Sequence, residues 1–297
     1  MSDEISIVIP TYERAHVLER TLDSYATQVD VREVILIDDG GSEANASDLR
    51  DLASVHGNTR VVRLRDRVGQ PQARMHGVQE ASTDYVLFGE DDVILGPEFS
   101  EVLLAHGRAM GAEVVAGAVV YLRPSERISD GRGRYLAQPA VAQVPVDRAV
   151  GYRSDIRLAG DVLTPFLPGL MLVNRRVFDR LAFDSHYRGN AYREETDFTL
   201  RAWRSGIRSA RCPHALCFHL PRAEVVGGGQ HRMPGWRYEL SAIANNWRFL
   251  ARNAEHLRAS HGIKGSNIAL QLRFIMDRAR SVIRAKIAAS KAKPPST

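Results

Sequence analysis

Short apolar runs in the first third of the chain stop abruptly at polar residues. Residues 5–9 and 33–37 are nearly continuous β-branched runs, and residues 60–64 and 85–88 continue the series. Runs of this length and composition are typical of strands buried in a parallel sheet. The pattern therefore predicts four strands in the first 90 residues.

Segments of helical periodicity separate these runs, at residues 15–28 and 48–56. The alternation predicts a doubly wound α/β fold, in which ligands bind beyond the carboxyl ends of the strands. Three polar clusters stand at those ends: Pro10-Thr11-Tyr12-Glu13, Asp38-Asp39-Gly40-Gly41-Ser42 and Gly89-Glu90-Asp91-Asp92.

The third cluster places Glu90, Asp91 and Asp92 between two apolar runs. Three adjacent carboxylates repel one another and are poorly solvated there, so they need a cation or several hydrogen-bond donors nearby. Mg²⁺ or Mn²⁺ supplies that compensation, and Mg²⁺ is usually held by one or two carboxylates plus substrate phosphates. The cluster indicates a metal–phosphate site, with an acidic turn at a strand end as the alternative.

Residues 1–225 are expected to form one domain with two halves. The family resemblance described below implies a catalytic domain here, with a nucleotide half at residues 1–95 and an acceptor half at residues 113–220, which opens with a strand near 113–122. Residues 123–160 are irregular and rich in Arg, Gly and Pro, which favours a role in acceptor recognition.

Residues 226–297 are expected to form a C-terminal extension that opens with a hinge at Gly227-Gly228-Gly229. One hypothesis is a lid over residues 227–236, with His231 or Arg232 contacting phosphate; a plain linker is the alternative. Two helices are predicted to follow, over residues 236–252 and 266–290.

The positive charge of the protein belongs to its tail. The net charge is +5, while residues 261–297 carry eight Lys or Arg against the single acid Asp277, which leaves −2 for the rest. This distribution argues against a nucleic-acid-binding core.

The last predicted helix combines an apolar face with a basic remainder. It could pack on the catalytic domain or in a homo-oligomer, or lie on an anionic membrane. No apolar run approaches about 20 residues, and the N-terminus resembles no signal peptide. The predicted location is the cytoplasm, where the protein could also contact the inner face of the membrane. The apolar face comprises Ile268, Leu272, Ile275, Ala279, Val282 and Ile283.

The two cysteines lie close together in the sequence, and each has a histidine two residues after it. A zinc site made of Cys212, His214, Cys217 and His219 is conceivable, but the spacing matches no common zinc framework. The sequence therefore does not favour it.

Several motifs, in this order, resemble the family 2 glycosyltransferases. The resemblance covers residues 5–220 and implies a Rossmann-like A-type glycosyltransferase fold with a mixed, mostly parallel central sheet, to which the C-terminal helices are added. The motifs are Ser6 to Tyr12, Ile37 to Ser42, Gly69 to Arg74, Glu90-Asp91-Asp92, Pro168 to Val173 and Arg193 to Arg201.

The resemblance implies a nucleoside-diphosphate sugar as donor, a hydroxyl acceptor of unknown identity, and Mn²⁺ or Mg²⁺ as cofactor. Asp92 and His219 would bind the metal, and Glu90 and Asp91 would lie near the ribose. Asp39 would accept from the base or ribose and Arg74 would contact the nucleotide or its phosphates, although a turn residue and a solvated helix charge are the alternatives. The base pocket would be lined by Pro10, Thr11 and Glu13.

The resemblance also places a general base at Glu195, where the family usually has Asp. An inverting transferase needs one carboxylate to take the proton of the attacking hydroxyl. Successive helical residues diverge by about 100°, so Glu194, Glu195 and Asp197 cannot all point into one cleft. Asp197 is expected to pair with Arg201 and Glu194 to cap the helix, which leaves Glu195 without a local partner.

Two other functions remain open. A nucleotidyltransferase would share the sheet and the acidic site, but it would be expected to carry a Gly-rich basic loop where this chain has Pro10-Thr11-Tyr12-Glu13. A catalytically silent nucleotide-sugar-binding or scaffolding protein is the second alternative, because Glu90 and Glu195 replace the more usual Asp.

Overall fold

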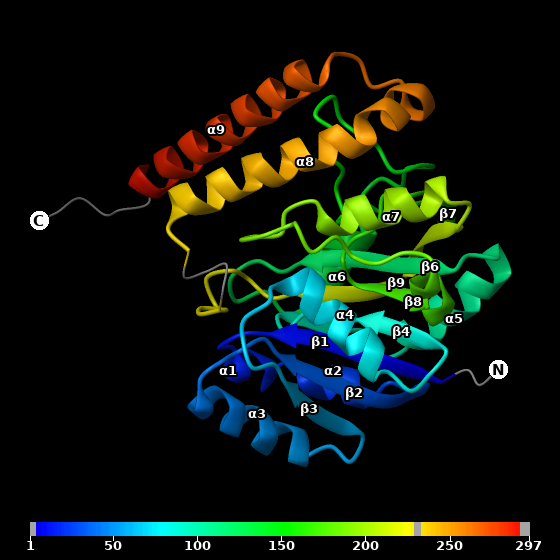
Figure 1. Ribbon diagram of the computed structural model, residues 1–297, viewed down its shortest axis with the longest axis vertical. Helices are drawn as coiled ribbons and strands as arrows, with labels where there is room; N and C mark the ends of the chain where they lie inside the picture. The colour runs from blue at the N-terminus through cyan, green and yellow to red at the C-terminus, as the bar shows by residue number, and fades with distance from the viewer. Residues whose placement is uncertain (1–3, 229–232, 292–297) are drawn as a thin grey trace, which may run out of the picture.

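A mixed nine-stranded sheet forms the centre of the protein, which is seen in a computed structural model that describes residues 4–228 and 233–291 (Figure 1). The strand order is β3-β2-β1-β4-β8-β6-β9-β5, and β7 pairs with β9. The four parallel ladders are longer than the four antiparallel ones. The predicted α/β fold with a mixed, mostly parallel sheet and C-terminal helices is confirmed.

The predicted parallel strands form the nucleotide half. They are β1 (Ile5–Thr11), β2 (Val31–Asp38), β3 (Thr59–Arg63) and β4 (Tyr85–Phe88). The apolar residues of β1 and most of those of β2 and β4 are buried because helices and loops cover both faces of a parallel sheet, whereas Val61 and Val62 of the edge strand β3 are half-buried. The ladders pair Thr11 with Asp38 and Val8 with Phe88, so the three polar clusters that follow these strands meet at one edge.

The helices of this half differ in detail from the prediction. The single helix expected over residues 15–28 is two short helices, α1 (Ala15–Leu18) and α2 (Leu22–Ala26). Thr21 lies at the break, where its hydroxyl donates to the Asp91 carbonyl at 3.0 Å. Helix α3 (Glu43–Ser54) begins earlier than predicted because Ser42 caps it, and α4 (Gln70–Glu80) follows β3.

The acceptor half continues the sheet with mixed strand directions. Its strands are β5 (Val93–Leu95), β6 (Val114–Tyr121), β7 (Val162–Leu163), β8 (Met171–Asn174) and β9 (Ser209–His219). Strand β8 joins the halves by pairing antiparallel with both β4 and β6. The helices of this half are α5 (Phe99–Met110), α6 (Ile128–Leu136), the 3₁₀ helix η1 (Arg175–Asp179) and α7 (Glu194–Arg204). Helix α6 corrects the prediction that residues 123–160 are wholly irregular.

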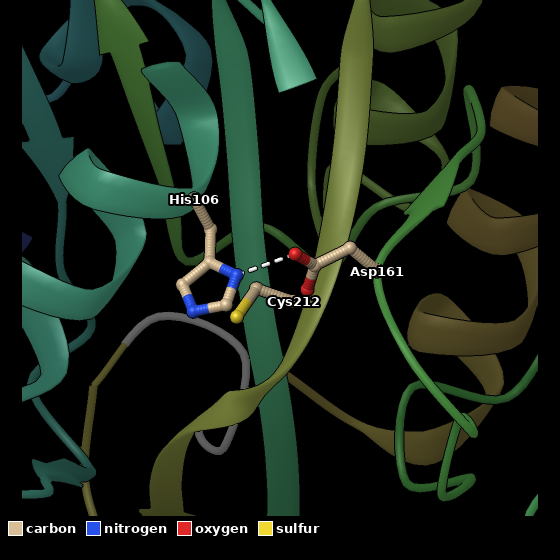
Figure 2. Close-up of side chains that lie close together, drawn as sticks. All are labelled: His106, Asp161 and Cys212. Atoms are coloured by element: carbon tan, nitrogen blue, oxygen red, sulfur yellow. Dashed lines mark hydrogen bonds and ion pairs between the residues drawn. The ribbon is translucent and has the colours of Figure 1, made fainter. Parts of the chain in front are cut away.

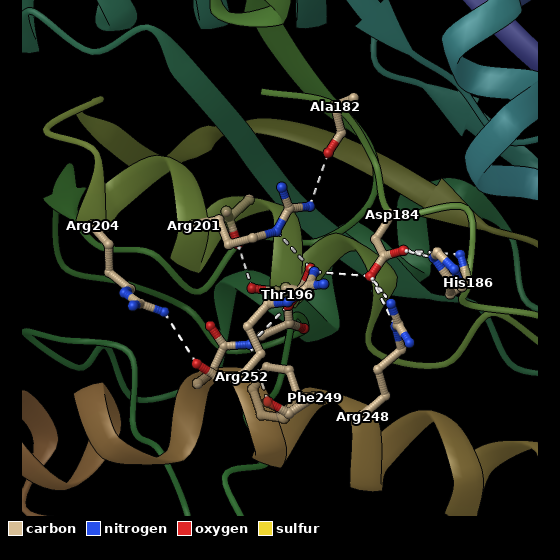
Figure 3. Close-up of polar contacts among 12 residues, drawn as sticks. Ala182, Asp184, His186, Thr196, Arg201, Arg204, Arg248, Phe249 and Arg252 are labelled. Carbon is tan, nitrogen blue, oxygen red and sulfur yellow. Dashed lines mark hydrogen bonds and ion pairs between the residues drawn. The ribbon is translucent and has the colours of Figure 1, made fainter. Parts of the chain in front are cut away.

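Two long helices, α8 (Gly235–His261) and α9 (Asn267–Lys291), pack on each other, with α8 beside α7 (Figure 1). Phe249 and Leu257 of α8 belong to an apolar cluster that also contains Leu200 of α7. Arg248 and Arg252 of α8 each lie 2.8 Å from the Asp184 carboxylate, in the polar network between α8 and the acceptor half (Figure 3). The first C-terminal helix is thus bound to the fold by both apolar packing and ion pairs.

The predicted apolar face of the last helix is only partly buried. Helix α9 packs through Leu270 and Phe274, whereas Ile268, Leu272 and Ile283 are more than half exposed. Packing of these three exposed side chains on the catalytic domain, one of the expected uses, is therefore wrong. Among the described residues, no helix combines the length and apolarity needed to cross a bilayer.

Candidate functional site

A cavity of about 820 Å³ opens at the sheet edge where the polar clusters meet. Eight of the ten residues singled out from the sequence line it: Pro10, Thr11, Asp39, Glu90, Asp91, Asp92, Glu195 and His219. Arg74 and Glu13 are not among its lining residues. The strand-end clusters and the start of α7 therefore form one site.

Glu90, Asp92 and His219 present a set of metal-ligand atoms that lie within 4.8 Å of one another. The pairing of Val93 with His219 brings the end of β9 beside the acidic turn, and His219 Nε2 lies 3.6 Å from Asp92 Oδ1. His219 Nδ1 contacts the Leu220 carbonyl at 2.8 Å, so this nitrogen is the donor of the contact and Nε2 is the ring nitrogen that faces Asp92.

This donor set fits a hard or borderline divalent ion, because it combines two carboxylates with one imidazole. Burial, followed by the nearby Asp92 charge, raises the pKa of Glu90, while His219 and Arg74 oppose that rise. A cation between these groups would relieve the repulsion. The structure thus groups Glu90 with Asp92 and His219.

Arg14 forms ion pairs with carboxylates of the same acidic turn. Its role was not identified from the sequence. Its Nη1 lies 2.8 Å from Asp91 Oδ1 and its Nη2 lies 2.9 Å from Asp92 Oδ2. Thr11 donates to the second Asp91 oxygen at 2.9 Å. Burial raises the pKa of Asp91 to about 7, even though Arg14 opposes the rise. A basic residue directly after the first strand end was the available signal.

Arg74 is completely buried, and three carboxylates surround it. Its Nη1 lies 2.7 Å from Glu194 and 3.4 Å from Glu195, and its Nη2 lies 3.8 Å from Glu90. The alternative of a solvated helix charge is therefore wrong. Burial raises the pKa of Glu194, and Arg74 opposes this rise. Glu194 is a buried partner of Arg74, a role that its sequence position did not reveal.

Glu195 faces the cavity with a side chain that is 24% exposed. The expected lack of a local partner does not leave Glu195 unpaired, because Arg74 of α4, which is distant in sequence, lies within ion-pair distance. Gly169 makes room for this arrangement: a Cβ there would stand 2.8 Å from Glu195 Oε1 and 2.9 Å from Arg74 Nη2. The Pro-Gly-Leu motif thus allows a carboxylate and a guanidinium to meet at the cavity wall.

Asp197 points away from the cavity, into the interface with α8. Its carboxylate receives hydrogen bonds from Arg201 at 2.7 Å, Arg252 at 3.1 Å and Asn253 at 2.8 Å. The predicted Arg201 partner is confirmed. Asp197 is fully buried in these contacts, so it is not available to an acceptor.

Asp39 and Glu13 both contact backbone amides. Asp39 accepts from Val68 N at 2.7 Å and Gly69 N at 3.0 Å, which shapes the loop that enters α4. Glu13 has a positive φ of 56°, accepts from Ser42 N and lines a smaller neighbouring hollow of about 330 Å³. Of these two residues, only Asp39 faces the main cavity.

The zinc set suggested by the cysteine spacing is not assembled. His219 belongs to the acidic turn, while Cys212 lies with a different histidine, His106. Gln230, His231 and Arg232, on which the lid hypothesis depended, lie outside the described residues.

The family model described as Glycosyl transferase family 2 matches residues 6–181, which is more than half of the chain. The chain belongs to glycosyl transferase family 2. The resemblance stated from the sequence motifs is confirmed, and the matched span includes the acidic turn and Arg74.

Curated relatives in this family match part of the chain. Validoxylamine A glucosyltransferase from Streptomyces hygroscopicus subsp. jinggangensis is 33% identical over 121 residues, covering 38% of this chain and 28% of the relative. Undecaprenyl-phosphate 4-deoxy-4-formamido-L-arabinose transferase from Proteus mirabilis is 33% identical over 101 residues, covering 32% of this chain and 31% of the relative. The chain thus spans about a third of the length of these relatives.

A solved structure described as GalNAc-T7 with UDP, GalNAc and Mn²⁺ shares the fold. Its TM-score is 0.62 at 18% identity, with 84% of this chain and 47% of the other covered. At that identity, the similarity extends to the fold alone.

Proposed function

We propose that this family 2 member is an inverting, metal-dependent glycosyltransferase that moves a sugar from a nucleoside-diphosphate sugar to an acceptor hydroxyl. One observation carries the proposal: the cavity is lined both by Glu195 and by the Glu90, Asp92 and His219 cluster. A carboxylate base and a site for a diphosphate-binding cation therefore face the same space. The Mn²⁺ and UDP of the GalNAc-T7 structure support this interpretation.

The donor would bind along the sheet edge. Pro10, Thr11 and Asp39 line the part of the cavity assigned to the base and ribose, and the Arg67 guanidinium stacks 4.2 Å over the Tyr12 ring beside it. Asp92, His219 and Glu90 would hold Mn²⁺ or Mg²⁺. The ion would neutralise the diphosphate as the bond to the anomeric carbon breaks.

Glu195 would act as the general base. Its carboxylate would take the proton of the acceptor hydroxyl as that oxygen attacks the anomeric carbon, and the nucleoside diphosphate would leave from the opposite face. Arg74 does not line the cavity, so we assign it a positioning role, in which it orients Glu195.

Sugar transfer fits the site better than nucleotidyl transfer, because the segment after β1 is Pro10-Thr11-Tyr12-Glu13 rather than a Gly-rich basic loop. An experiment distinguishes a transferase from a catalytically silent donor-binding protein. A transferase should release nucleoside diphosphate from its donor when Mn²⁺ is added and stop when EDTA is added. A silent protein would be stabilised thermally by the nucleotide but release no diphosphate. The shift in melting temperature with UDP, GDP, dTDP and CDP identifies the nucleotide that the sugar donor should carry in this assay.

The C-terminal helices fit a peripheral membrane role within this proposal. Helix α9 exposes Ile268, Leu272 and Ile283 next to basic residues such as Arg280 and Arg284. The name of the Proteus mirabilis relative includes a lipid phosphate, undecaprenyl phosphate. We therefore include contact with an anionic membrane surface at the cytoplasmic face, with a homo-oligomer as the alternative use of these helices.

A further inference from the structure

A second group of metal-ligand side chains lies at the other end of β9 from His219. His106 extends from α5, Asp161 from the loop before β7, and Cys212 from β9 (Figure 2). A ring nitrogen, a carboxylate oxygen and the Cys212 sulfur all lie within 4.8 Å of one another. His106 Nδ1 contacts Asp161 Oδ2 directly.

An irregularity in β9 places Cys212 in this group. Ala116 of β6 pairs with Arg211 and Ala118 pairs with Leu216, so residues 212–215 stand opposite the single residue Gly117. A Cβ on Gly117 would lie 2.3 Å from the Ala215 carbonyl oxygen, so the bulge requires glycine there. The bulge interrupts the alternation of the strand. Its exposed His214 has a ring centroid 5.6 Å from that of His106.

One carboxylate oxygen of the group lacks a strong hydrogen-bond donor or a cation beside it in the described part of the chain. Asp161 Oδ1 is buried and accepts no hydrogen bond from an N–H or O–H group of the described residues, although the Cys212 thiol, a weak donor, interacts with the same carboxylate. A buried carboxylate oxygen without a partner is unfavourable, and a bound cation is one of the few ligands that satisfies it. This oxygen is thus an independent indication of a missing ligand.

A catalytic Cys-His-Asp arrangement is excluded by burial. Cys212 is only 1% exposed, so its sulfur cannot reach a substrate carbonyl. Metal binding has no such requirement, because a small ion needs only a path past one ligand. His106, whose side chain is 32% exposed, offers that path.

We propose that His106, Asp161 and Cys212 form a zinc site. Sulfur, imidazole and carboxylate donors together select Zn²⁺ over Mg²⁺ or Ca²⁺, which prefer oxygen alone. Ligand atoms in a tetrahedral zinc site are about 3.3–3.8 Å apart, so these three need only small movements. Water or the exposed His214, whose ring centroid lies 5.6 Å from that of His106, would complete the coordination.

The site would anchor a segment that lines the active cavity. Residues 137–161 connect α6 to β7 and are held together by the bridge between Val141 and Leu158. Gly151, Tyr152 and Ser154 of this segment line the cavity. Zinc at Asp161 would tie the end of the segment to α5 and β9, a structural role that does not depend on the proposed sugar transfer.

Zinc titration of the EDTA-treated, dialysed full-length protein tests this site. An Asp92→Asn background disables the cavity cluster, so that one zinc per chain is expected from the second site alone. Cys212→Ser should lower zinc affinity at least about 100-fold and abolish the thiolate-to-metal charge-transfer band seen with Co²⁺. Cys217→Ser is the matched control, since Cys217 is equally buried on β9 but lies outside the group.

Equal zinc affinity in the Cys212→Ser and Cys217→Ser proteins, or a Co²⁺ complex without the thiolate band, would overturn the proposal. Should circular dichroism show that Cys212→Ser is unfolded, His106→Asn replaces it, with His76→Asn at an exposed position of α4 as control. Weaker zinc binding in His106→Asn alone supports the site, and unchanged binding overturns it.

Discussion

Arg74 and Glu194 form an ion pair that is almost entirely inside the protein, with 2.7 Å between Nη1 and Oε1 and side-chain exposures of 0% and 1%. The pair joins α4 to α7 behind the cavity wall. Because Arg74 also lies 3.4 Å from Glu195, the pair sets the charge environment of the proposed base.

Glu194→Gln should therefore affect both stability and turnover. Removing one partner of a buried ion pair costs up to about 3–5 kcal/mol when the other charge is left uncompensated; the loss here should be smaller, because Glu195 and Glu90 still lie beside Arg74, and chemical denaturation measures it. Arg74 would then hold the Glu195 carboxylate more tightly, which should reduce kcat more than it changes donor KM. Glu80→Gln is the control: its pair with Arg60 is exposed, so the loss should stay below about 1 kcal/mol. Equal losses in the two variants would contradict the structural role of Glu194.

Glu195→Gln tests the base directly, because it keeps the size of the side chain and removes its basicity. Transfer should fall by about 10²–10⁴-fold, while nucleotide binding should be unchanged. Glu195→Asp should restore part of the rate, since it returns a carboxylate on a shorter arm. Glu101→Gln, on the exposed face of α5, should transfer at the parent rate. Near-parent transfer by Glu195→Gln with both substrates saturating would disprove the assignment, and Asp197 could not replace it because it is fully buried.

Asp92→Asn should uncouple nucleotide binding from metal. The diphosphate and the acidic turn repel each other until a divalent ion bridges them. Calorimetric titration of the parent should show much tighter nucleoside diphosphate binding with Mn²⁺ than with EDTA, whereas the variant should bind weakly in both. Asp23→Asn, exposed on α2, should behave like the parent. If the parent itself binds equally with EDTA and Mn²⁺, the metal has no part in the mechanism.

The sequence was most informative where chain direction alone brings residues together. The acidic turn, Thr11 and Asp39 all follow parallel strands, and parallel strands end at the same edge, so their proximity follows from the strand pattern. His219 is next to them because β9 pairs with β5, a relationship that the family resemblance supplied.

Contacts without local periodicity could not be predicted in this way. Arg74 and Glu194 are 120 positions apart, and their pairing depends on how α4 and α7 pack. The bulge at residues 212–215 depends on tertiary contacts around Gly117 that strand propensity does not encode. The split between α1 and α2 likewise places Thr21 against the Asp91 carbonyl, a contact between distant segments.

Protonation of Asp184 should lower the stability of the protein in acid, because its carboxylate links α8 to the acceptor half. Burial alone would raise its pKa, but hydrogen bonds from His186 and Arg248 outweigh burial and hold the pKa below its usual value (Figure 3). A carboxylate with a depressed folded-state pKa contributes stability above its unfolded pKa of about 3.9, and that contribution is lost as pH falls through the folded pKa.

Asp184→Asn should thus lower the free energy of unfolding by about 1–3 kcal/mol at neutral pH and flatten the acid limb of the stability curve. Denaturant midpoints measured from pH 7 down to about pH 2, below the unfolded pKa of the carboxyl, give both quantities. Asp51→Asn, exposed on α3, is the control and should keep the parent curve. An acid limb in Asp184→Asn as steep as in the parent would assign the acid sensitivity to other groups.

The two C-terminal helices should bind anionic membranes through side chains that the fold leaves exposed. On α8, Trp236, Leu240 and Trp247 are spaced by four and seven residues, which places them on one face. On α9, Ile268, Leu272, Met276 and Ile283 form a similar stripe, with Arg280 and Arg284 exposed nearby. Apolar insertion combined with basic attraction is typical of helices that lie at a membrane surface.

The full-length protein should therefore float with liposomes that contain anionic lipid at low salt, and less with neutral liposomes or at high salt. Leu272→Glu should reduce flotation because it places a charge within the apolar stripe. Val55→Glu is the matched control, since Val55 is 74% exposed but lies beyond α3, far along the chain from the helical pair. If the parent protein stays at the bottom of the gradient at low salt, membrane binding is excluded. Light scattering would then decide whether Leu272→Glu splits a dimer formed through the same stripe.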